Sequence, residues 1–135
     1  LSPGGVISGS PTNAGAANFT VRVADTLYQS ATQDLSITIS DVLTITTTSL
    51  PNAKEGQAYT TTLASSGGIP PLSWSVTPNL PDGLSLNTGT GEISGTPGPA
   101  TGIGAPQTFT FTVQDSSTPT PQTASKPLDL TIEAP

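Results

Sequence analysis

The chain of 135 residues contains no Cys, no His and no Met. The absence of Cys excludes a disulfide framework and thiolate chemistry. Without His or Cys, the Ser–His–Asp and Cys–His mechanisms are excluded, and a typical zinc site lacks its preferred ligands. The sequence has no phosphate-binding loop that ends in Lys, and it brings no pair of carboxylates together beside a cleft. We therefore expect that the chain is not an enzyme.

Basic residues are also scarce. Three Lys and Arg stand against nine Asp and Glu, which gives a net charge of −6. Nucleic acids and anionic membrane surfaces need clustered cations, so we expect neither as a partner. No apolar run is long enough to span a bilayer, so we expect no direct membrane insertion. The acidic groups either attract a divalent cation or simply keep an extracellular protein soluble.

Apolar and aromatic residues are few, with 33% hydrophobic residues and only one Trp, two Tyr and three Phe. This supply suffices for a thin core but not for a large globular interior. No window shows apolar residues at helical spacing, so we expect essentially no helix. The 14 Gly and 14 Pro supply turns, and the β-branched Thr residues suit half-buried strands. The composition predicts an all-β chain.

Three segments of the sequence occur twice. The string Gly5-Val-Ile-Ser-Gly-Ser-Pro11 returns as Gly91-Glu-Ile-Ser-Gly-Thr-Pro97, a spacing of 86 residues from Gly5 to Gly91. An alternating strand that ends in Asp follows each copy, and an alternating apolar strand closes it: Phe19 to Asp25 and Phe109 to Asp115; Leu35, Ile37, Ile39 and Leu128, Leu130, Ile132. A repeat of this period is typical of an array of domains. We expect residues 1–41 to be the second half of one repeat, residues 42–135 to be a complete repeat, and the chain to be a piece of a longer protein.

Strand patterns within residues 42–135 predict one antiparallel β-sandwich. Seven short alternating strands are expected between turn signals, at 43–45, 57–63, 72–76, 84–86, around 93, at 109–113 and at 128–132. In residues 1–41 we expect a short strand around Val6–Ile7 and longer strands at 17–24 and 34–40. Trp74 either stacks on a sugar ligand or anchors the core, and its apolar i±2 neighbours favour the core.

Four linked motifs carry a resemblance to a known family. They occur in the order residues 67–76, Leu80-Pro-Asp-Gly-Leu84, residues 90–97 and residues 109–115. In these motifs the sequence resembles the bacterial putative Ig domain, a family of cadherin-like β-sandwiches found in tandem in large surface and secreted proteins. The resemblance covers residues 43–133 as one repeat and residues 1–41 as half of another. It implies antiparallel Ig-like or cadherin-like sandwich repeats with adhesion, matrix or spacer roles and no catalysis. The lack of Cys suits a bacterial or archaeal protein outside the cell or on its surface.

The resemblance also implies calcium between repeats. The matching acidic residues here are Asp41, Asp115, Asp25 and Glu55. By analogy with cadherin-like repeats, Asp41 and Asp115 share one junction, whereas Asp25 and Glu55 face the outer ends. Calcium takes six to eight oxygen ligands, so a pair of carboxylates needs carbonyls and water as well. The alternative is that these Asp residues cap turns through Asx hydrogen bonds, because the chain after Asp41 lacks a denser acidic linker.

The half repeat leaves an apolar face that needs a cover, because an isolated two-stranded hairpin is marginal in water. The residues of this candidate interface are Phe19, Val21, Val23, Leu35, Ile37 and Ile39. The cover is either the upstream half of the same repeat or strands from a neighbouring chain. We accordingly expect a spacer and adhesion repeat whose partners are neighbouring repeats or subunits and a surface ligand. The alternative is a subunit of an assembled filament or surface layer. A carbohydrate-binding module is a weaker hypothesis, because the aromatic supply is thin.

Overall fold

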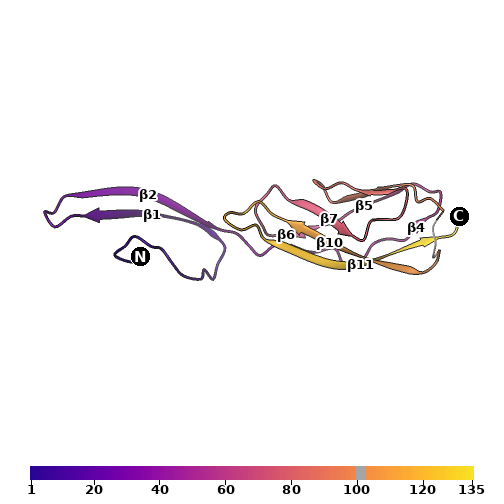
Figure 1. Ribbon diagram of the computed structural model, residues 1–135, viewed down its shortest axis with the longest axis horizontal. Helices are drawn as coiled ribbons and strands as arrows, with labels where there is room; N and C mark the ends of the chain where they lie inside the picture. The colour runs from indigo at the N-terminus through magenta and orange to yellow at the C-terminus, as the bar shows by residue number, and fades with distance from the viewer. Residues whose placement is uncertain (100–102) are drawn as a thin grey trace. The chain divides into compact units, whose positions relative to one another are not determined.

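The computed structural model describes residues 1–99 and 103–135, and its regular structure consists of β-strands alone (Figure 1). The prediction of an all-β chain is confirmed, since no helix occurs among these residues. The chain divides into two compact units, which we call unit 1 (Leu1–Asp41) and unit 2 (Val42–Pro135).

Unit 1 is built around one antiparallel hairpin. Strand β1 (Gly15–Ala24) pairs with β2 (Ser30–Ile39) in a register that places Phe19 opposite Leu35. Side chains alternate across a strand, so the apolar residues gather on one face and Thr, Ser and Asp on the other. On the polar face, the Thr20 hydroxyl donates a hydrogen bond of 2.5 Å to Asp34 Oδ1.

The strand that we expected around Val6–Ile7 does not form in unit 1, and this prediction was wrong. The same segment has two strand partners in its unit 2 copy, where residues 92–95 pair on both sides. A strand is defined by its ladder of hydrogen bonds, and unit 1 offers no neighbouring strand to residues 6–9 among its described residues.

Unit 2 contains nine strands in its described residues, two more than the seven predicted. They are β3 (Thr44–Ile45), β4 (Ala53–Lys54), β5 (Tyr59–Thr62), β6 (Ser65–Ser66), β7 (Ser73–Thr77), β8 (Leu84–Leu86), β9 (Glu92–Gly95), β10 (Pro106–Gln114) and β11 (Thr123–Glu133). The two that were missed, β4 and β6, have two residues each. Such short strands carry no alternation pattern, because pairing with a distant segment defines them.

The strands of unit 2 form two main sheets. One has the order β4-β11-β10-β7 and the other β5-β9-β8, and β3 with β6 forms a separate short pair. Strand β10 pairs antiparallel with both β11 and β7, whereas β4 lies parallel to β11. Thr and Ser fill exposed positions and bond across strands, as where Thr112 Oγ1 lies 2.7 Å from Ser125 Oγ.

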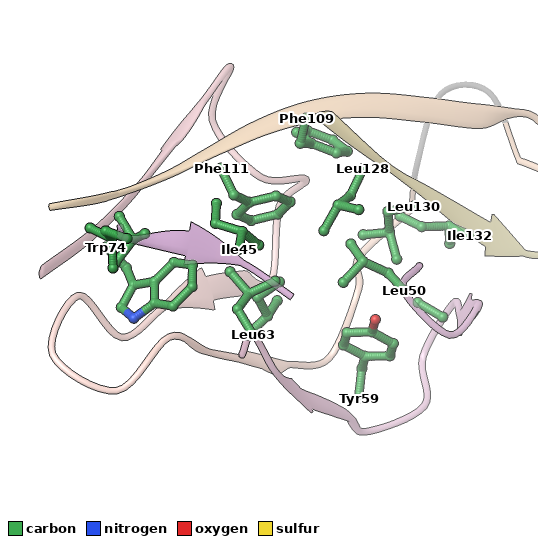
Figure 2. Packing of buried hydrophobic residues seen from close by; sticks show 14 residues of the cluster. Ile45, Leu50, Tyr59, Leu63, Trp74, Phe109, Phe111, Leu128, Leu130 and Ile132 are labelled. Carbon is green, nitrogen blue, oxygen red and sulfur yellow. The ribbon is translucent and has the colours of Figure 1, made fainter. Parts of the chain in front are cut away.

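The core lies between these sheets, and its side chains come from most strands of unit 2 (Figure 2). Phe109, Phe111 and Val113 are buried together on one face of β10, as their alternation predicted. Trp74 is 5% exposed, so the prediction of a core Trp is confirmed and the sugar-stacking alternative is excluded for its ring. Loss of a buried aromatic of this size leaves a large cavity.

The motif at Leu80–Leu84 forms a tight turn that packs against the end of β9 and is hydrogen-bonded to the residue that follows it. The Leu84 amide donates to the Pro81 carbonyl at 3.0 Å, and the Thr96 amide donates to the Gly83 carbonyl at 3.0 Å. A Cβ built at Gly95 would overlap the Gly83 carbonyl oxygen, so two backbones meet where a side chain cannot fit.

Candidate functional sites

The apolar face of the β1–β2 hairpin is the first candidate site. The structure brings the six predicted interface residues onto this single face: Phe19, Val21, Val23, Leu35, Ile37 and Ile39. Val23 is 67% exposed, Leu35 45% and Ile37 38%, and the other three are half-buried. Leu1 and Ile7 line a groove of about 360 Å³ together with residues of this face. That the six residues form an interface stays a prediction.

Asp25 caps the loop between β1 and β2. Its Oδ1 accepts hydrogen bonds from the amides of Leu27 at 2.8 Å and Gln29 at 2.9 Å. The Asp25 amide in turn donates to the Gln29 carbonyl at 2.9 Å, which closes the loop. These are hydrogen bonds of the Asx type, in which the side-chain oxygen of Asp accepts from a backbone amide as the carbonyl oxygen of an ordinary turn would.

Asp115 occupies the same place in the loop between β10 and β11, but its carboxylate also accepts a hydrogen bond from a second loop. Oδ1 accepts bonds from the Ser117 amide and hydroxyl at 3.1 and 2.7 Å and from the Gln122 amide at 2.7 Å. Oδ2 accepts a bond of 3.0 Å from the amide of Ile69, which lies in a different loop. Asp115 is therefore buried, at 4% exposed, and joins two loops that are far apart in the sequence.

The hydrogen bonds to Asp115 control its ionisation. Burial would raise the pKa of this carboxyl, but the bonds from the Ser117 hydroxyl and from the amides of Ile69, Gln122 and Ser117 lower the pKa to about 2. Hydrogen bonds donated to a carboxylate favour its charged form. Asp115 is thus a fixed negative charge that holds its loop, and proton transfer is not its role near neutral pH.

The remaining acidic candidates lie apart from these loops within their own units. Asp41 is exposed at the end of unit 1 and Glu55 is half-buried after β4, where the Glu55 amide donates to the Glu133 carbonyl at 3.0 Å. Among residues 1–99 and 103–135, no group of three or more acidic side chains is arranged to hold a metal ion. Asp25 and Asp115 already accept hydrogen bonds from amides at Oδ1, so calcium, which takes six to eight oxygen ligands, would have to compete with these donors. Calcium binding by Asp41 together with Asp115 stays a prediction.

Sequence reasoning missed two features of unit 2. One is the bond from Ile69 to Asp115, for which the adjacent Gly67-Gly68 pair is the only local signal. A Cβ at Gly68 would lie 3.1 Å from the Asp115 Cβ, so Gly lets the two loops approach. The other is a groove of about 400 Å³ between β7 and β8, lined by Trp74, Val76, Leu80, Leu84 and Leu86 among others.

No helix in the described part of the chain is long and apolar enough to cross a membrane.

Comparisons with known proteins agree with this architecture. A search of curated proteins found no match. Among solved structures, the chain is similar to protocadherin gamma B2 extracellular cadherin domains 3–6, with a TM-score of 0.51, 20% identity and coverage of 89% of this chain and 34% of that one. The mouse clustered PcdhgC3 EC1-3 structure gives a TM-score of 0.50 and 14% identity, with coverage of 87% and 43%. The chain thus spans less than half the length of these structures, and at such identities the likeness shows a cadherin-like fold alone.

The sequence comparison identifies the family. Residues 42–133 match the model of the family described as Putative Ig domain, and this match covers most of unit 2 and more than half of the chain. Ig-like and cadherin-like repeat domains are typically non-catalytic. The chain therefore belongs to the Putative Ig domain family.

Proposed function

We propose that the chain is a non-catalytic spacer and adhesion module of an extracellular or cell-surface protein of a bacterium or archaeon. The observation that carries this proposal is the repetition of one structural element in both units. The β1–β2 and β10–β11 hairpins have the same register, with Phe19 opposite Leu35 and Phe109 opposite Leu128. Repetition extends a protein without adding a new site, which suits a spacer. The family and the cadherin-like fold support a place outside the cell.

The pairing of β4 with β11 supports a role under tension. These strands are parallel, and each lies near one end of unit 2 in the sequence. Pulling the two ends apart slides parallel strands past each other, so their hydrogen bonds resist together. Two bonds strengthen this contact: the Glu55 amide donates to the Glu133 carbonyl at 3.0 Å, and Asn52 Nδ2 donates to Glu133 Oε1 at 2.8 Å.

Single-molecule stretching tests the spacer role. The chain has no Cys, so Cys introduced at Leu1 and Pro135 gives unique attachment points. We expect one main unfolding event for unit 2, with a release of roughly 300 Å of chain at about 3.3–3.6 Å per residue.

A second attachment geometry is the matched control. Pro106 and Thr131 are paired at the open end of the β10–β11 hairpin, so a tether between Pro106 and Pro135 separates the strands one bond at a time. The end-to-end tether should require the higher force. Equal forces in the two geometries would contradict a spacer built to carry tension.

We further propose that calcium binds at the junction between repeats. It is supported by the family resemblance and by the acidic residues Asp41 and Asp115, whose positions in the sequence match such a junction. The bound ion would fix the orientation of neighbouring repeats rather than the fold of either one. Because Asp115 is committed to four hydrogen bonds, we expect any such site to be weak.

The exposed apolar face of unit 1 favours one alternative function, a subunit of an extracellular filament or surface layer. In that case a neighbouring chain would cover the face. Light scattering across a concentration series separates the two functions, because a filament subunit assembles as its concentration rises and a spacer stays monomeric.

A further inference from the structure

The hairpin of unit 1 reproduces the hairpin of unit 2 in its register and in the hydrogen bonds that cap its loop, although the loop after β10 is longer than the loop after β1. Beyond the common register, the loop caps agree: the Asp25 amide bonds the Gln29 carbonyl at 2.9 Å, and the Asp115 amide bonds the Gln122 carbonyl at 3.0 Å. Each Asp Oδ1 also accepts the amide two residues further on, from Leu27 and from Ser117.

The segment before the hairpin is also shaped like its copy. Gly5 and Gly9 have φ angles of 80° and 150°, and the matching Gly91 and Gly95 have φ angles of 74° and 140°. Only Gly adopts such angles without strain. Ile7, which matches the buried Ile93, lines the groove along the apolar face of the hairpin. The two Gly residues that bracket residues 6–8 thus have nearly the φ angles of their copies around β9, although residues 6–8 form no strand in unit 1.

The two units differ in what surrounds these elements. A Cβ at Gly91 would lie 2.9 Å from Trp74 Cε2, and a Cβ at Gly95 would overlap the Gly83 carbonyl oxygen. Apart from the Gly itself and the residues next to it in the chain, no heavy atom of the described chain lies within 4 Å of a Cβ built at Gly5 or Gly9. Asp115 Oδ2 binds the Ile69 amide, whereas the hydrogen bonds described for the Asp25 side chain all come from its own loop. The groups missing around unit 1 all belong, in unit 2, to one stretch of sequence, residues 43–86.

We propose that the apolar face of the β1–β2 hairpin binds a β-strand segment of the type of residues 43–86, in the same polypeptide, and that this completes a second sandwich. The segment supplies a strand antiparallel to β1, as β7 is to β10, and a strand parallel to β2, as β4 is to β11. In this arrangement a Trp of the segment packs against Gly5, as Trp74 packs against Gly91, and a turn of the segment contacts Gly9, as the turn at Gly83 contacts Gly95. A loop amide of the segment donates to the Asp25 carboxylate, as the Ile69 amide donates to Asp115. A second copy of this chain is a poor donor, because its own residues 43–86 are already part of unit 2.

The first turn of unit 1 favours a segment joined in cis. The Ser2 amide donates to the Val6 carbonyl at 2.9 Å, and the Asn87 amide donates to the matching Glu92 carbonyl at 2.8 Å in unit 2, so both turns close on the same carbonyl, with the turn of unit 1 one residue shorter. That turn in unit 2 sends β8 back antiparallel to β9. A segment joined to Leu1 is therefore directed along residues 6–9 in the orientation that β8 has along β9.

The test adds a copy of residues 43–86 directly before Leu1 of the full chain. Residues 1–4 then occupy the place that residues 87–90 have in unit 2. The readout is hydrogen–deuterium exchange of β1 and β2, whose peptides differ in sequence from those of unit 2. We expect exchange of these amides to slow by at least about a hundredfold relative to the unmodified chain, because a completed sandwich opens only by unfolding.

Two Gly substitutions in the extended chain provide the matched controls. Gly9→Ala places a Cβ where the Gly83 backbone of the added segment must lie, so it should abolish the protection. Gly4→Ala should retain the protection, because the position that matches Gly4 in unit 2 is Thr90 and already carries a side chain.

Three outcomes would overturn the proposal. The first is exchange in β1 and β2 as fast in the extended chain as in the unmodified chain. The second is equal protection in the Gly9→Ala and Gly4→Ala variants. The third is protection that appears only in a dimer by light scattering, which would replace the cis segment by exchange between chains. The readout concerns the fold of unit 1 alone, so its result is independent of the stretching test of the spacer role.

Discussion

The hairpins β1–β2 and β10–β11 are nearly the same local structure in two different environments. Phe109, Phe111 and Val113 are at most 3% exposed in unit 2. In unit 1, Val23, which matches Val113, is 67% exposed. On the second strand, Leu128 is 4% exposed and the matching Leu35 is 45% exposed. Alternation and turn residues thus determine the hairpin and its register, but the burial that stabilises it depends on strands elsewhere in the sequence.

Burial also decides which substitutions matter. A fully buried apolar side chain contributes about 1.5–3 kcal/mol, so the face of β10 and β11 supplies much of the stability of unit 2. The same face in unit 1 contributes little until it is covered. Substitutions at matched positions of the two hairpins therefore test whether the apolar face stabilises unit 2 more than unit 1.

The largest contrast is expected for the two matched Phe residues. Phe109→Ala should lower the free energy of unfolding of unit 2 by about 3–5 kcal/mol, because it leaves a cavity in the core. Phe19→Ala should leave that free energy unchanged within about 0.5 kcal/mol. Denaturant unfolding followed by the fluorescence of Trp74 reports on unit 2 alone, since it is the only Trp. Equal losses in the two variants would show that unit 1 and unit 2 unfold together.

The second contrast concerns the close approach of two backbones. Gly95→Ala should cost about 2–4 kcal/mol, because the new Cβ overlaps the Gly83 carbonyl and the backbone takes a strained φ. Gly9→Ala should not change the unfolding of unit 2. Thermal unfolding of the two variants measures the difference. A stable Gly95→Ala variant would mean that the turn at Leu80–Leu84 can move away.

The parts of the fold that the sequence predicted are those governed by neighbouring residues. The alternation around Trp74 and along residues 109–113 predicted burial correctly, because a strand fixes which side chains share a face. The expected strands at 84–86 and 128–132 were also found. Gly and Pro within Leu80–Leu84 predicted a turn, and the structure shows its hydrogen bond, donated by the Leu84 amide to the Pro81 carbonyl.

What the sequence could not predict depends on distant partners. Ala53 of β4 is buried between the exposed Asn52 and Lys54, and only its pairing with β11 makes it a strand. Residues 6–7 looked like a strand, but no ladder partner is present in unit 1. The bond from Ile69 to Asp115 spans 46 residues, so the role of Asp115 as a link between loops had no local pattern.

A smaller contrast is expected between the two loop caps, and it depends on pH. The pKa of Asp115 is about 2 in the folded protein and 3.8 as the ordinary value, so the unfolded chain binds a proton first as the pH falls. The stability from this group is present above about pH 4 and is lost between about pH 4 and pH 2. Asp115→Asn should lower the denaturant midpoint of unit 2 at pH 7 and flatten its fall over that pH range. Asp25→Asn should leave both unchanged, and an unaltered pH profile in Asp115→Asn would assign the acid sensitivity to other carboxyl groups.

The smallest effect is expected for calcium, because the carboxylate that it would need is already hydrogen-bonded. A ligand that binds only the folded state stabilises it by RT ln(1 + [L]/Kd), which is about 1.4 kcal/mol at ten times Kd. Amide donors direct their hydrogens at Asp115 Oδ1, so calcium would have to displace them, and we expect a gain below that value at millimolar calcium. Thermal unfolding of the full chain with calcium and with a chelator measures the gain, and Asp41→Asn and Asp115→Asn should each remove it. A stabilisation that persists in both variants would place the ion elsewhere, whereas a much larger one that both variants remove would show that the Asp115 loop rearranges around the metal.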